Sequence, residues 1–527
     1  MADSKVPWIL KLLVIGSFIF KLTLLNLDLY RSTDFEVHRN WLAITHSLPF
    51  REWYIEDTSH WTLDYPPLFG VFEWALSQPA ALVDPKMLDV KNLEYASRAT
   101  IVFQRCSVIV GDLVLLVGAM RLAFSVAAPK SSPDRAAWVA AALLLCSPGL
   151  ILVDHVHFQY NGMMLGILLW SAADIEAGNH YRGAAWFCIL LNMKQIFLYV
   201  APVYFVYLLR VHCGLDFTGG FRLCIRALFK LGVEVVAIFA AVWVPVLLTG
   251  QGSNALSRLF PFGRGLTHAY WAPNVWALYN TADRALAKLG FAPEGGAAGS
   301  TAGFAEVFES SVLWTIPPKA TFALTLAAYV PLSILIWRQT RPSSAARAQR
   351  GLFPMYVALG CAIAFACGWH VHEKAILMVT VPMMAAVPAL IGSDTDSELN
   401  FRQAAFALSV TSTFSMLPLL PQRSTETIFK WLLLIGGHLL EWKLLRIPAR
   451  STLCHRVGGW LPVWLLFLAI AALGLYVDFG GHTLIFRGRM EFLPLLLMSD
   501  FSAIVVLSSF CRLTLCVAHF HSRQKDE

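Results

Sequence analysis

Long apolar stretches alternate with short polar ones along the chain, and this pattern predicts helices that cross a membrane. A bilayer core of about 30 Å needs roughly 20 apolar residues in helical form. Segments of suitable length lie at residues 7–29, 99–122, 136–153, 161–177, 228–249, 318–337, 351–368, 374–391, 403–421, 427–445, 458–478 and 491–517. A further apolar segment, residues 183–209, is interrupted by Asn192, Lys194 and Pro202, which favours two short or broken helices. The pattern therefore predicts about fourteen transmembrane helices.

The first apolar run carries two lysines, Lys11 and Lys21. Long basic side chains in a span can reach the interface with their ammonium groups, so we expect both lysines to do so. The run continues into charged sequence without a small-residue cleavage site, which is not typical of a removable signal peptide. We therefore expect it to remain as the first span.

Clusters of arginine and lysine between the spans predict the orientation, because cytoplasmic connections carry an excess of positive charge. The clusters lie at residues 210–230, 338–350 and 443–456, and Lys5 and Lys11 mark the amino end. All of them share one side only if residues 183–209 cross twice, with both termini cytoplasmic. The opposite side then receives residues 30–98, 154–160, 250–317 and 369–373.

Composition agrees with an all-α, polytopic membrane protein. Of 527 residues, 57% are hydrophobic and 14% are charged, which a water-soluble globule would not show. The mean hydropathy is +0.59. The net charge of +7 lies in short clusters between spans rather than on one face, so we expect no nucleic-acid partner. Neither long loop contains a cysteine, so no disulfide can form within them.

The first span leads into an acidic and aromatic stretch, STDFEVHRNW, which offers two carboxylates, Asp34 and Glu36, beside His38 and Arg39. A carboxylate here could act as a general base, or the Asp-x-Glu pair could hold a divalent cation. The same residues also match the start of an interfacial helix, with Ser32, Thr33 or Asp34 as the N-cap. Both interpretations stay open from the residues alone.

Two further motifs place polar groups on the same side. In WTLDYPP, Asp64 and Tyr65 precede two prolines, which stiffen the chain, and Trp61 fits an interfacial anchor. In VDHVHFQYNG, the short connection between two spans holds many polar groups, namely Asp154, His155, His157, Gln159, Tyr160 and Asn161. Such groups donate and accept hydrogen bonds, as sugar recognition requires. The connection holds more polar groups than a turn needs, and ionisable groups at the end of a span cost free energy.

The motif GWHVHEKAIL contributes His370, His372, Glu373 and Lys374 between two later spans. The spacing is not that of a helical zinc site and no third ligand is signalled, so we predict no metal site. Two histidines and a lysine favour an anion such as phosphate.

The long loop 250–317 adds cationic and aromatic side chains. They are Arg258, Arg264, His268, Tyr270, Trp271 and Trp276. Aromatic faces beside polar groups suit a sugar, whereas an interfacial aromatic belt is the alternative.

Taken in order, STDFEVHRNW, WTLDYPP, VDHVHFQYNG, FPFGRGL and GWHVHEKAIL resemble motifs of the dolichyl-phosphate-glucose-dependent glucosyltransferases of asparagine-linked glycosylation, which have the GT-C fold. The resemblance covers residues 32–377, and beyond residue 400 only the hydropathy is similar. It implies a catalytic membrane module over residues 1–400, with lumenal loops 30–98 and 250–317, followed by C-terminal transmembrane helices over residues 401–527. Within the family, THAYWAPNVWALYN is more similar to enzymes that add the second glucose than to those that add the first.

The resemblance implies a multi-pass protein of the endoplasmic reticulum membrane with its active site facing the lumen. The expected donor is dolichyl phosphate β-D-glucose, the acceptor is the lipid-linked oligosaccharide Glc1Man9GlcNAc2-PP-dolichol, and the α-1,3 linkage forms with inversion and without a cofactor. Asp34 is then the base, and Lys374 with His370 would hold the leaving phosphate. The remaining candidates would bind substrate: Glu36, Asp64, Tyr65, Asp154, His157, Gln159, Tyr160, Asn161, Arg264, His268, Tyr270, Trp271, His372 and Glu373.

Three alternatives remain. The chain could be the first glucosyltransferase, acting on Man9GlcNAc2-PP-dolichol, or a sister enzyme that uses dolichyl phosphate mannose. More remotely it could be a polytopic lipid transporter, although such proteins usually show repeat symmetry and charges near the bilayer midplane. Here the charges gather at span ends on one predicted face.

Overall fold

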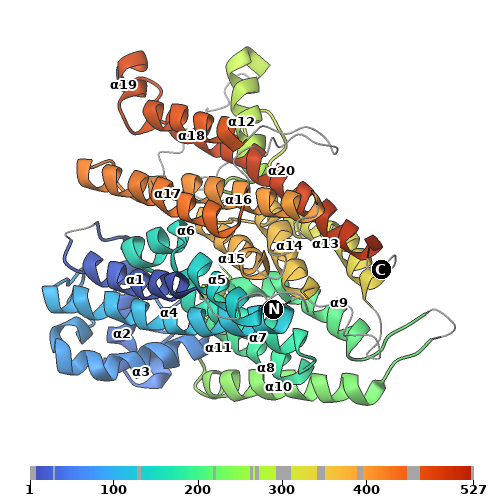
Figure 1. The fold of residues 1–527 in the computed structure, drawn as a ribbon. Coiled ribbons are helices and arrows are strands. Elements are labelled where there is room, and N and C mark those ends of the chain that lie inside the picture. The colour runs from blue at the N-terminus through green and yellow to red at the C-terminus, as the bar shows by residue number, and fades with distance from the viewer. Residues whose placement is uncertain are drawn as a thin grey trace. The chain divides into compact units, whose positions relative to one another are not determined.

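A computed structural model describes most of the chain, and its ordered elements are helices (Figure 1). The described residues are 7–27, 30–127, 132–217, 221–260, 265–267, 272–291, 310–340, 351–387, 396–447 and 463–523. Within these ranges the β pairing is limited to two isolated bridges, Asp216 with Arg222 and Thr267 with Val371. The predicted all-α fold class is therefore confirmed for this part of the chain.

The chain divides into two compact units. Unit 1 comprises Met1–Cys146, Leu150–Pro261 and Ile336–Pro354, and unit 2 comprises Ser147–Gly149, Phe262–Leu335 and Met355–Glu527. The predicted division after residue 400 separates the part with family-like motifs from the rest. The two units are defined by contacts in space, whereas the boundary at residue 400 is defined by motifs in the sequence. That boundary stays a prediction.

Unit 1 holds the helices of the first half of the chain. They are α1 (Trp8–Leu24), α2 (Thr33–Ser47), η1 (Phe50–Glu52), α3 (Pro67–Val83), η2 (Pro85–Leu88), α4 (Arg98–Val126), α5 (Pro133–Leu145), η3 (Ile151–Phe158), α7 (Asn161–Glu176), α8 (His180–Met193), η4 (Gln195–Val200), α9 (Ala201–Val211), α10 (Ile225–Leu248) and α11 (Gly252–Leu259). The short α6 (Pro148–Leu150) lies where the two units join in sequence.

Helices α4 and α7 of unit 1 approach each other through glycines. A Cβ atom added to Gly118 would lie 2.5 Å from the carbonyl oxygen of Gly166, and one added to Gly166 would lie 2.6 Å from the backbone nitrogen of Leu115. Real Cβ atoms do not come so close to backbone atoms. Small residues allow this close packing, which transmembrane helices use because lipid provides little hydrophobic drive for association.

Unit 2 contains the later helices. They are α12 (Val275–Leu286), η5 (Ala287–Phe291), most of α13 (Pro318–Gln339) and α14 (Leu352–Cys367), η7 (Glu373–Ile376), α15 (Leu377–Ala386), α16 (Asp396–Met416), η9 (Leu417–Leu419), α17 (Ser424–Leu444), α18 (Val463–Val477), α19 (Gly481–Phe486) and α20 (Leu493–Arg523). Helix α16 packs on α20, where the rings of Phe414 and Phe501 meet at 6.2 Å.

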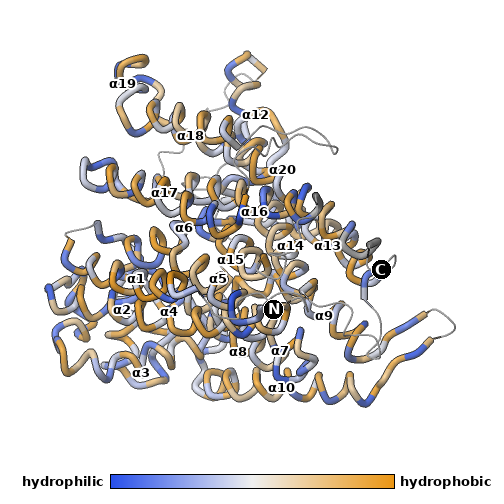
Figure 2. The backbone as a smooth tube through the Cα atoms, in the orientation of Figure 1, coloured by the Kyte–Doolittle hydropathy of each residue, from blue (hydrophilic) through white to orange (hydrophobic). Residues whose placement is uncertain are grey.

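The apolar character of the helices is that of a membrane protein. Five of the described helical segments are long and apolar enough to cross a bilayer, over residues 98–126, 133–158, 225–248, 318–339 and 493–519. Helix α10 turns most of its apolar residues outward: Phe229 is 69% exposed and Leu248 is 82% exposed. Figure 2 shows its largely hydrophobic course. Such a surface is costly in water and favourable in lipid.

The described residues of the predicted spans are mostly helical, although span 136–153 is broken between α5 and α6. The number of crossings stays a prediction. The interrupted segment 183–209 is indeed broken. Helix α8 ends at Met193, Lys194 is extended with φ −151° and ψ 116°, and a 3-10 helix follows.

The expectation for Lys21 is wrong. Its side chain is 2% exposed and pairs with Asp112 over 2.6 Å, so it does not reach an interface. Asp112 also lies 2.9 Å from Nε2 of His155. A buried charge is tolerated where an opposite charge compensates its lost hydration, and α4 supplies that carboxylate.

Candidate active site

A distorted turn in unit 1 presents the polar side chains of VDHVHFQYNG. Residues 151–158 form a π-helix, and Phe158 ends it with φ +85°, a conformation that is unfavourable for a bulky residue. π-Helical segments and strained residues are frequent at functional sites. The Phe158 ring packs against Phe35 at 5.4 Å and Tyr160 at 5.6 Å, and these contacts hold the turn in place.

The turn meets Asp34 at the start of α2. Gln159 donates from Nε2 to Oδ2 of Asp34 over 2.6 Å, and Nε2 of His157 lies 3.1 Å from the same oxygen. Ser32, the N-cap residue of α2, donates its hydroxyl to the carbonyl of His157 rather than capping its own helix. The Asp34 side chain remains 21% exposed. A carboxylate held by two side chains, beside the positive end of a helix dipole and still accessible, suits a general base.

Glu36 does not lie with Asp34 as a second carboxylate of the same site. It forms an ion pair with Arg39, whose Nε and Nη2 atoms lie 2.8 and 2.7 Å from its two oxygens. Arg39 is fully buried and also donates to the carbonyl of Met87 over 2.9 Å. The pair therefore ties α2 to η2, whereas binding of substrate by Glu36 stays a prediction.

His38, one helical turn after Asp34, pairs with Glu73 of α3. Nδ1 of His38 lies 2.7 Å from Oε1 of Glu73, which is fully buried. Burial raises the pKa of Glu73 above its ordinary value of 4.5, although the hydrogen bond to His38 opposes this. The pair fixes the face of α2 that carries Asp34.

Asp154 is part of the turn's support. It is 1% exposed and accepts hydrogen bonds from the backbone nitrogen of Gly162 over 2.5 Å and from Nδ2 of Asn161 over 2.9 Å. Both donors lie in the first turn of α7, where backbone N–H groups lack partners within the helix. Binding of substrate by Asp154 stays a prediction.

Lys194 belongs to the cluster although it lies in none of the polar motifs of the sequence. It lies at the break between α8 and η4, donates to Oδ1 of Asn161 over 3.1 Å and places its ammonium 5.1 Å from the centre of the Tyr65 ring. Asn161 in turn donates to Oε1 of Gln159 over 2.7 Å. The signal in the sequence is a lysine within an apolar segment, which is costly in a membrane and typical of functional positions as well as of a helix break.

The residues of WTLDYPP also lie in unit 1. Tyr65 packs on Trp41 at 4.9 Å, and burial raises the pKa of its phenol well above the ordinary value of 10. The carbonyl of Asp64 accepts from Gln195 over 3.1 Å. The Trp61 side chain is 40% exposed, which fits the predicted anchor. Tyr160 is 4% exposed, and its hydroxyl lies 2.6 Å from that of Ser107.

The cationic motif lies in unit 2. His370 has φ +51°, its Nδ1 lies 2.7 Å from the carbonyl of Gly265, and its ring meets that of His372 at 5.4 Å. Glu373 is 1% exposed and opens η7, and Lys374 follows it. The remaining loop candidates, Arg264, His268, Tyr270 and Trp271, lie outside the described residues.

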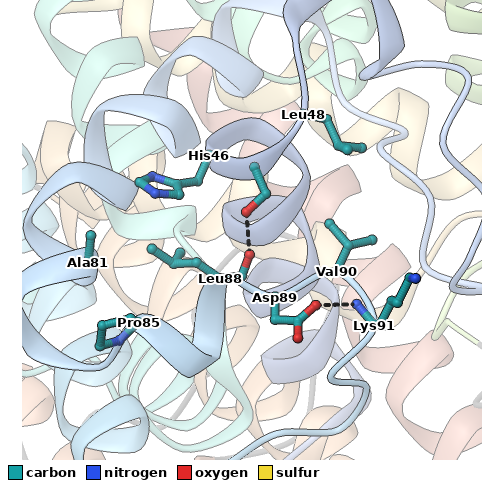
Figure 3. A pocket seen from close by; sticks show the side chains of 9 residues that line it. His46, Leu48, Ala81, Pro85, Leu88, Asp89, Val90 and Lys91 are labelled. Carbon is teal, nitrogen blue, oxygen red and sulfur yellow. Dashed lines mark hydrogen bonds between the residues drawn. The ribbon is translucent and has the colours of Figure 1, made fainter.

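A pocket of about 450 Å³ lies at the other end of α2, and Figure 3 shows its lining. It is lined by His46, Ser47, Leu48, Ala81, Pro85, Leu88, Asp89, Val90 and Lys91. His46 follows Asp34 by about 18 Å along the helix at 1.5 Å per residue. None of the predicted site residues lines this pocket, so it is not the cluster around Asp34.

A family model and individual known proteins match this chain, and they agree with one another. The model of the family described as "ALG6, ALG8 glycosyltransferase family" matches residues 9–513. A Drosophila melanogaster protein named probable dolichyl pyrophosphate Glc1Man9GlcNAc2 alpha-1,3-glucosyltransferase is 42% identical, over 93% of this chain and 91% of the relative. An Arabidopsis thaliana protein named dolichyl pyrophosphate Glc1Man9GlcNAc2 alpha-1,3-glucosyltransferase is 40% identical, over 91% of this chain and 92% of the relative. A Bos taurus protein of the same name is 38% identical, over 93% of this chain and 92% of the relative.

Proposed function

The chain belongs to the ALG6, ALG8 glycosyltransferase family, and on this premise we propose that it adds the second glucose to the lipid-linked oligosaccharide. Its acceptor is Glc1Man9GlcNAc2-PP-dolichol, and its donor is dolichyl phosphate β-D-glucose. The relatives named for this acceptor support the proposal, because they match more than nine tenths of the chain. The observation that carries the chemistry is the Asp34 carboxylate, which His157 and Gln159 hold at the start of α2.

Asp34 is the base of this reaction. The acceptor hydroxyl gives its proton to Asp34 as its oxygen bonds to the anomeric carbon of glucose. The bond from that carbon to the phosphate oxygen breaks on the opposite face, so the β-linked donor yields an α linkage. Dolichyl phosphate leaves as a stable anion and needs no acid. A glycosidase needs a second carboxyl group because its leaving oxygen must be protonated.

Lys374 and His370 hold the leaving phosphate in this proposal. A positive charge stabilises the negative charge that the phosphate oxygen gains as the bond breaks. Both residues belong to a motif that combines two histidines and a lysine within five positions, which supports an anion site.

The lumenal face of the endoplasmic reticulum carries the active site in this proposal, as the positive-inside pattern indicates. The segment from His268 to Asn280 then contacts the terminal glucose of the acceptor, with His268, Tyr270 and Trp271 as its aromatic and polar groups. A site built to hydrogen-bond that glucose rejects an acceptor without it, because buried polar groups would lose their partners.

A transfer assay with purified protein and defined acceptors tests the proposal. Dolichyl phosphate glucose is offered with acceptors that bear no glucose or one glucose, and the Asp34→Asn variant serves as the inactive control. We expect transfer only to the monoglucosylated acceptor. Transfer to the unglucosylated acceptor alone would identify the first enzyme of the family, and no transfer to either would refute the proposal.

A further inference from the structure

A continuous chain of hydrogen bonds runs from Lys194 to Asp34 through two amide side chains. Lys194 Nζ donates to Asn161 Oδ1 over 3.1 Å, Asn161 Nδ2 donates to Gln159 Oε1 over 2.7 Å, and Gln159 Nε2 donates to Asp34 Oδ2 over 2.6 Å. Each group donates in the same direction, from the ammonium group toward the carboxylate.

The contact with Lys194 determines the orientation of the Asn161 amide. An ammonium group has donors and no acceptor, so only the amide oxygen can face Lys194. The Asn161 nitrogen then faces Asp154, whose Oδ1 lies 2.9 Å away and accepts its hydrogen bond. A rotated Asn161 amide would place its NH₂ group against the Lys194 ammonium, and neither group accepts a hydrogen bond.

The orientation of Gln159 follows from that of Asn161. Because the Asn161 nitrogen faces Gln159, the Gln159 amide presents its oxygen there and its N–H groups to Asp34. With the opposite orientation, the Gln159 oxygen would face the Asp34 carboxylate, and two acceptors would repel each other. A neutral amide has no preference of its own, so the charged ends of the chain decide which way it points.

We propose that Lys194 is a positioning residue for the base: it sets the direction of the amide chain so that Gln159 donates to Asp34. This inference rests on the proposed function, in which Asp34 takes the acceptor proton. Lys194 acts through Asn161 and Gln159. It keeps Asp34 ionised and its Oδ2 atom fixed, because a hydrogen bond donated to a carboxylate stabilises the charged form.

The position of Lys194 along the chain fits this role. The backbone leaves the helical conformation at Lys194, although its nitrogen still bonds to the carbonyl of Leu190 over 2.9 Å. The ammonium group lies over the ring of Tyr65, which neighbours the same cluster. A charge in this apolar segment costs free energy, and a polar chain that ends on a reacting carboxylate explains why it is kept.

The Lys194→Met variant tests the inference, because methionine keeps the length and loses the donors and the charge. Without Lys194 the Asn161 oxygen loses its charged donor, and the amide chain holds the Asp34 carboxylate less firmly. We expect kcat at neutral pH to fall roughly 10-fold, less than the 10²- to 10⁴-fold loss typical of a missing base. The acidic limb of the kcat profile should move to higher pH, while KM for the donor changes little.

Lys194→Arg and Lys230→Met provide the controls. Arginine is also a donor without an acceptor, so Lys194→Arg should restore much of the rate and the wild-type acidic limb. Lys230 is exposed on α10, and its replacement by methionine should change neither. If Lys194→Met folds poorly, Lys194→Arg and Lys194→Gln can be compared instead, since only arginine forces one orientation on the amides.

Other ionisable groups near Asp34 are common to all these variants. His157 contacts the same oxygen, Asp154 lies behind Asn161, and Tyr65 interacts electrostatically with Asp34. Lys194 also interacts electrostatically with Asp154, and Lys194→Arg keeps that charge. The comparison of Lys194→Met with Lys194→Arg therefore controls for these neighbours.

The outcomes separate the two proposals. Activity in Asp34→Asn would overturn the proposed base. An inactive Asp34→Asn beside a Lys194→Met variant with wild-type kcat and pH profile would overturn only the role of Lys194. A change confined to donor KM in Lys194→Met would also overturn it, because it would show direct contact with substrate.

Discussion

Gln159 donates a hydrogen bond from Nε2 to Oδ2 of Asp34 over 2.6 Å, although 125 positions separate the two residues. Asp34 opens the helix that follows the first span, and Gln159 follows the π-helical turn before α7. The contact brings two motifs into one site, and it defines which atom of the carboxylate is held by the protein.

Replacement of Asp34 by asparagine should abolish transfer. The amide cannot take a proton from the acceptor hydroxyl, and loss of a general base typically lowers the rate by about 10² to 10⁴. The measurement is initial rate with purified protein, beside donor binding, which should persist. Asp89→Asn, at an exposed position of the same loop, is the matched control, and it creates no Asn-x-Ser/Thr sequon. More than half of wild-type activity in Asp34→Asn would contradict the assignment.

Glycosylation of engineered sequons should report the predicted orientation. The natural chain contains no Asn-x-Ser/Thr sequon, so any modification reports the new site alone. Sequons near Asp57 and near Gly299 should be modified, because lumenal loops meet the glycosylation machinery, whereas one near Ser344 should not. The readout is a mobility shift that glycosidase treatment reverses. Modification only near Ser344 would invert the topology.

Replacement of Lys374 by alanine should weaken donor binding. Loss of a hydrogen bond to a charged group corresponds to roughly 10- to 100-fold in affinity. Lys374→Arg should recover part of it, because the charge is kept and the geometry is not. Binding of dolichyl phosphate glucose to the purified variants is the measurement, with the exposed Lys91→Ala as the control. Normal donor affinity in Lys374→Ala would place the phosphate elsewhere.

Replacement of Gly166 by alanine should loosen the packing of α4 on α7. The added Cβ atom would lie 2.6 Å from the backbone nitrogen of Leu115, so the helices must separate. Overpacking of this kind costs roughly 1–3 kcal/mol. Gly232→Ala is the matched control, since nothing lies within 4 Å of its added Cβ. Thermal unfolding in detergent compares the two, and equal midpoints would contradict the close approach.

The stability of the protein should depend on pH through Glu73. Burial raises the pKa of Glu73 in the folded state above 4.5, so folding favours the protonated form. Its contribution to stability is complete below pH 4.5 and is lost as the pH rises through the raised pKa. Relative to Glu73→Gln, which does not titrate, the wild-type protein should therefore lose stability as the pH rises from 4.5.

Thermal unfolding midpoints of wild type and Glu73→Gln, measured from pH 4 to pH 8, check this expectation. Glu94→Gln, at an exposed position, controls for the loss of a surface carboxylate. A constant difference between wild type and Glu73→Gln across this range would show that Glu73 titrates alike in the folded and unfolded chains.

The helices were predictable from the sequence because they depend on local properties. The length and hydropathy of a segment determine whether it can cross a bilayer, and the described residues of the predicted spans are mostly helical. The break near Lys194 was predictable for the same reason, since polar residues and a proline interrupt one apolar run. The motifs that gave the resemblance are also local, and the family match over residues 9–513 agrees with them.

The partners of the polar side chains depended on tertiary structure. The sequence marked Asp34, His157, Gln159 and Asn161 as candidates, but it did not indicate that three of them form one chain with Lys194. Local patterns could not show that Lys21 pairs with Asp112, because 91 positions separate them. A hydrogen bond requires contact within about 3 Å. Only the packing of distant helices brings these groups so close, whereas hydropathy along the chain is sufficient to define the helices themselves.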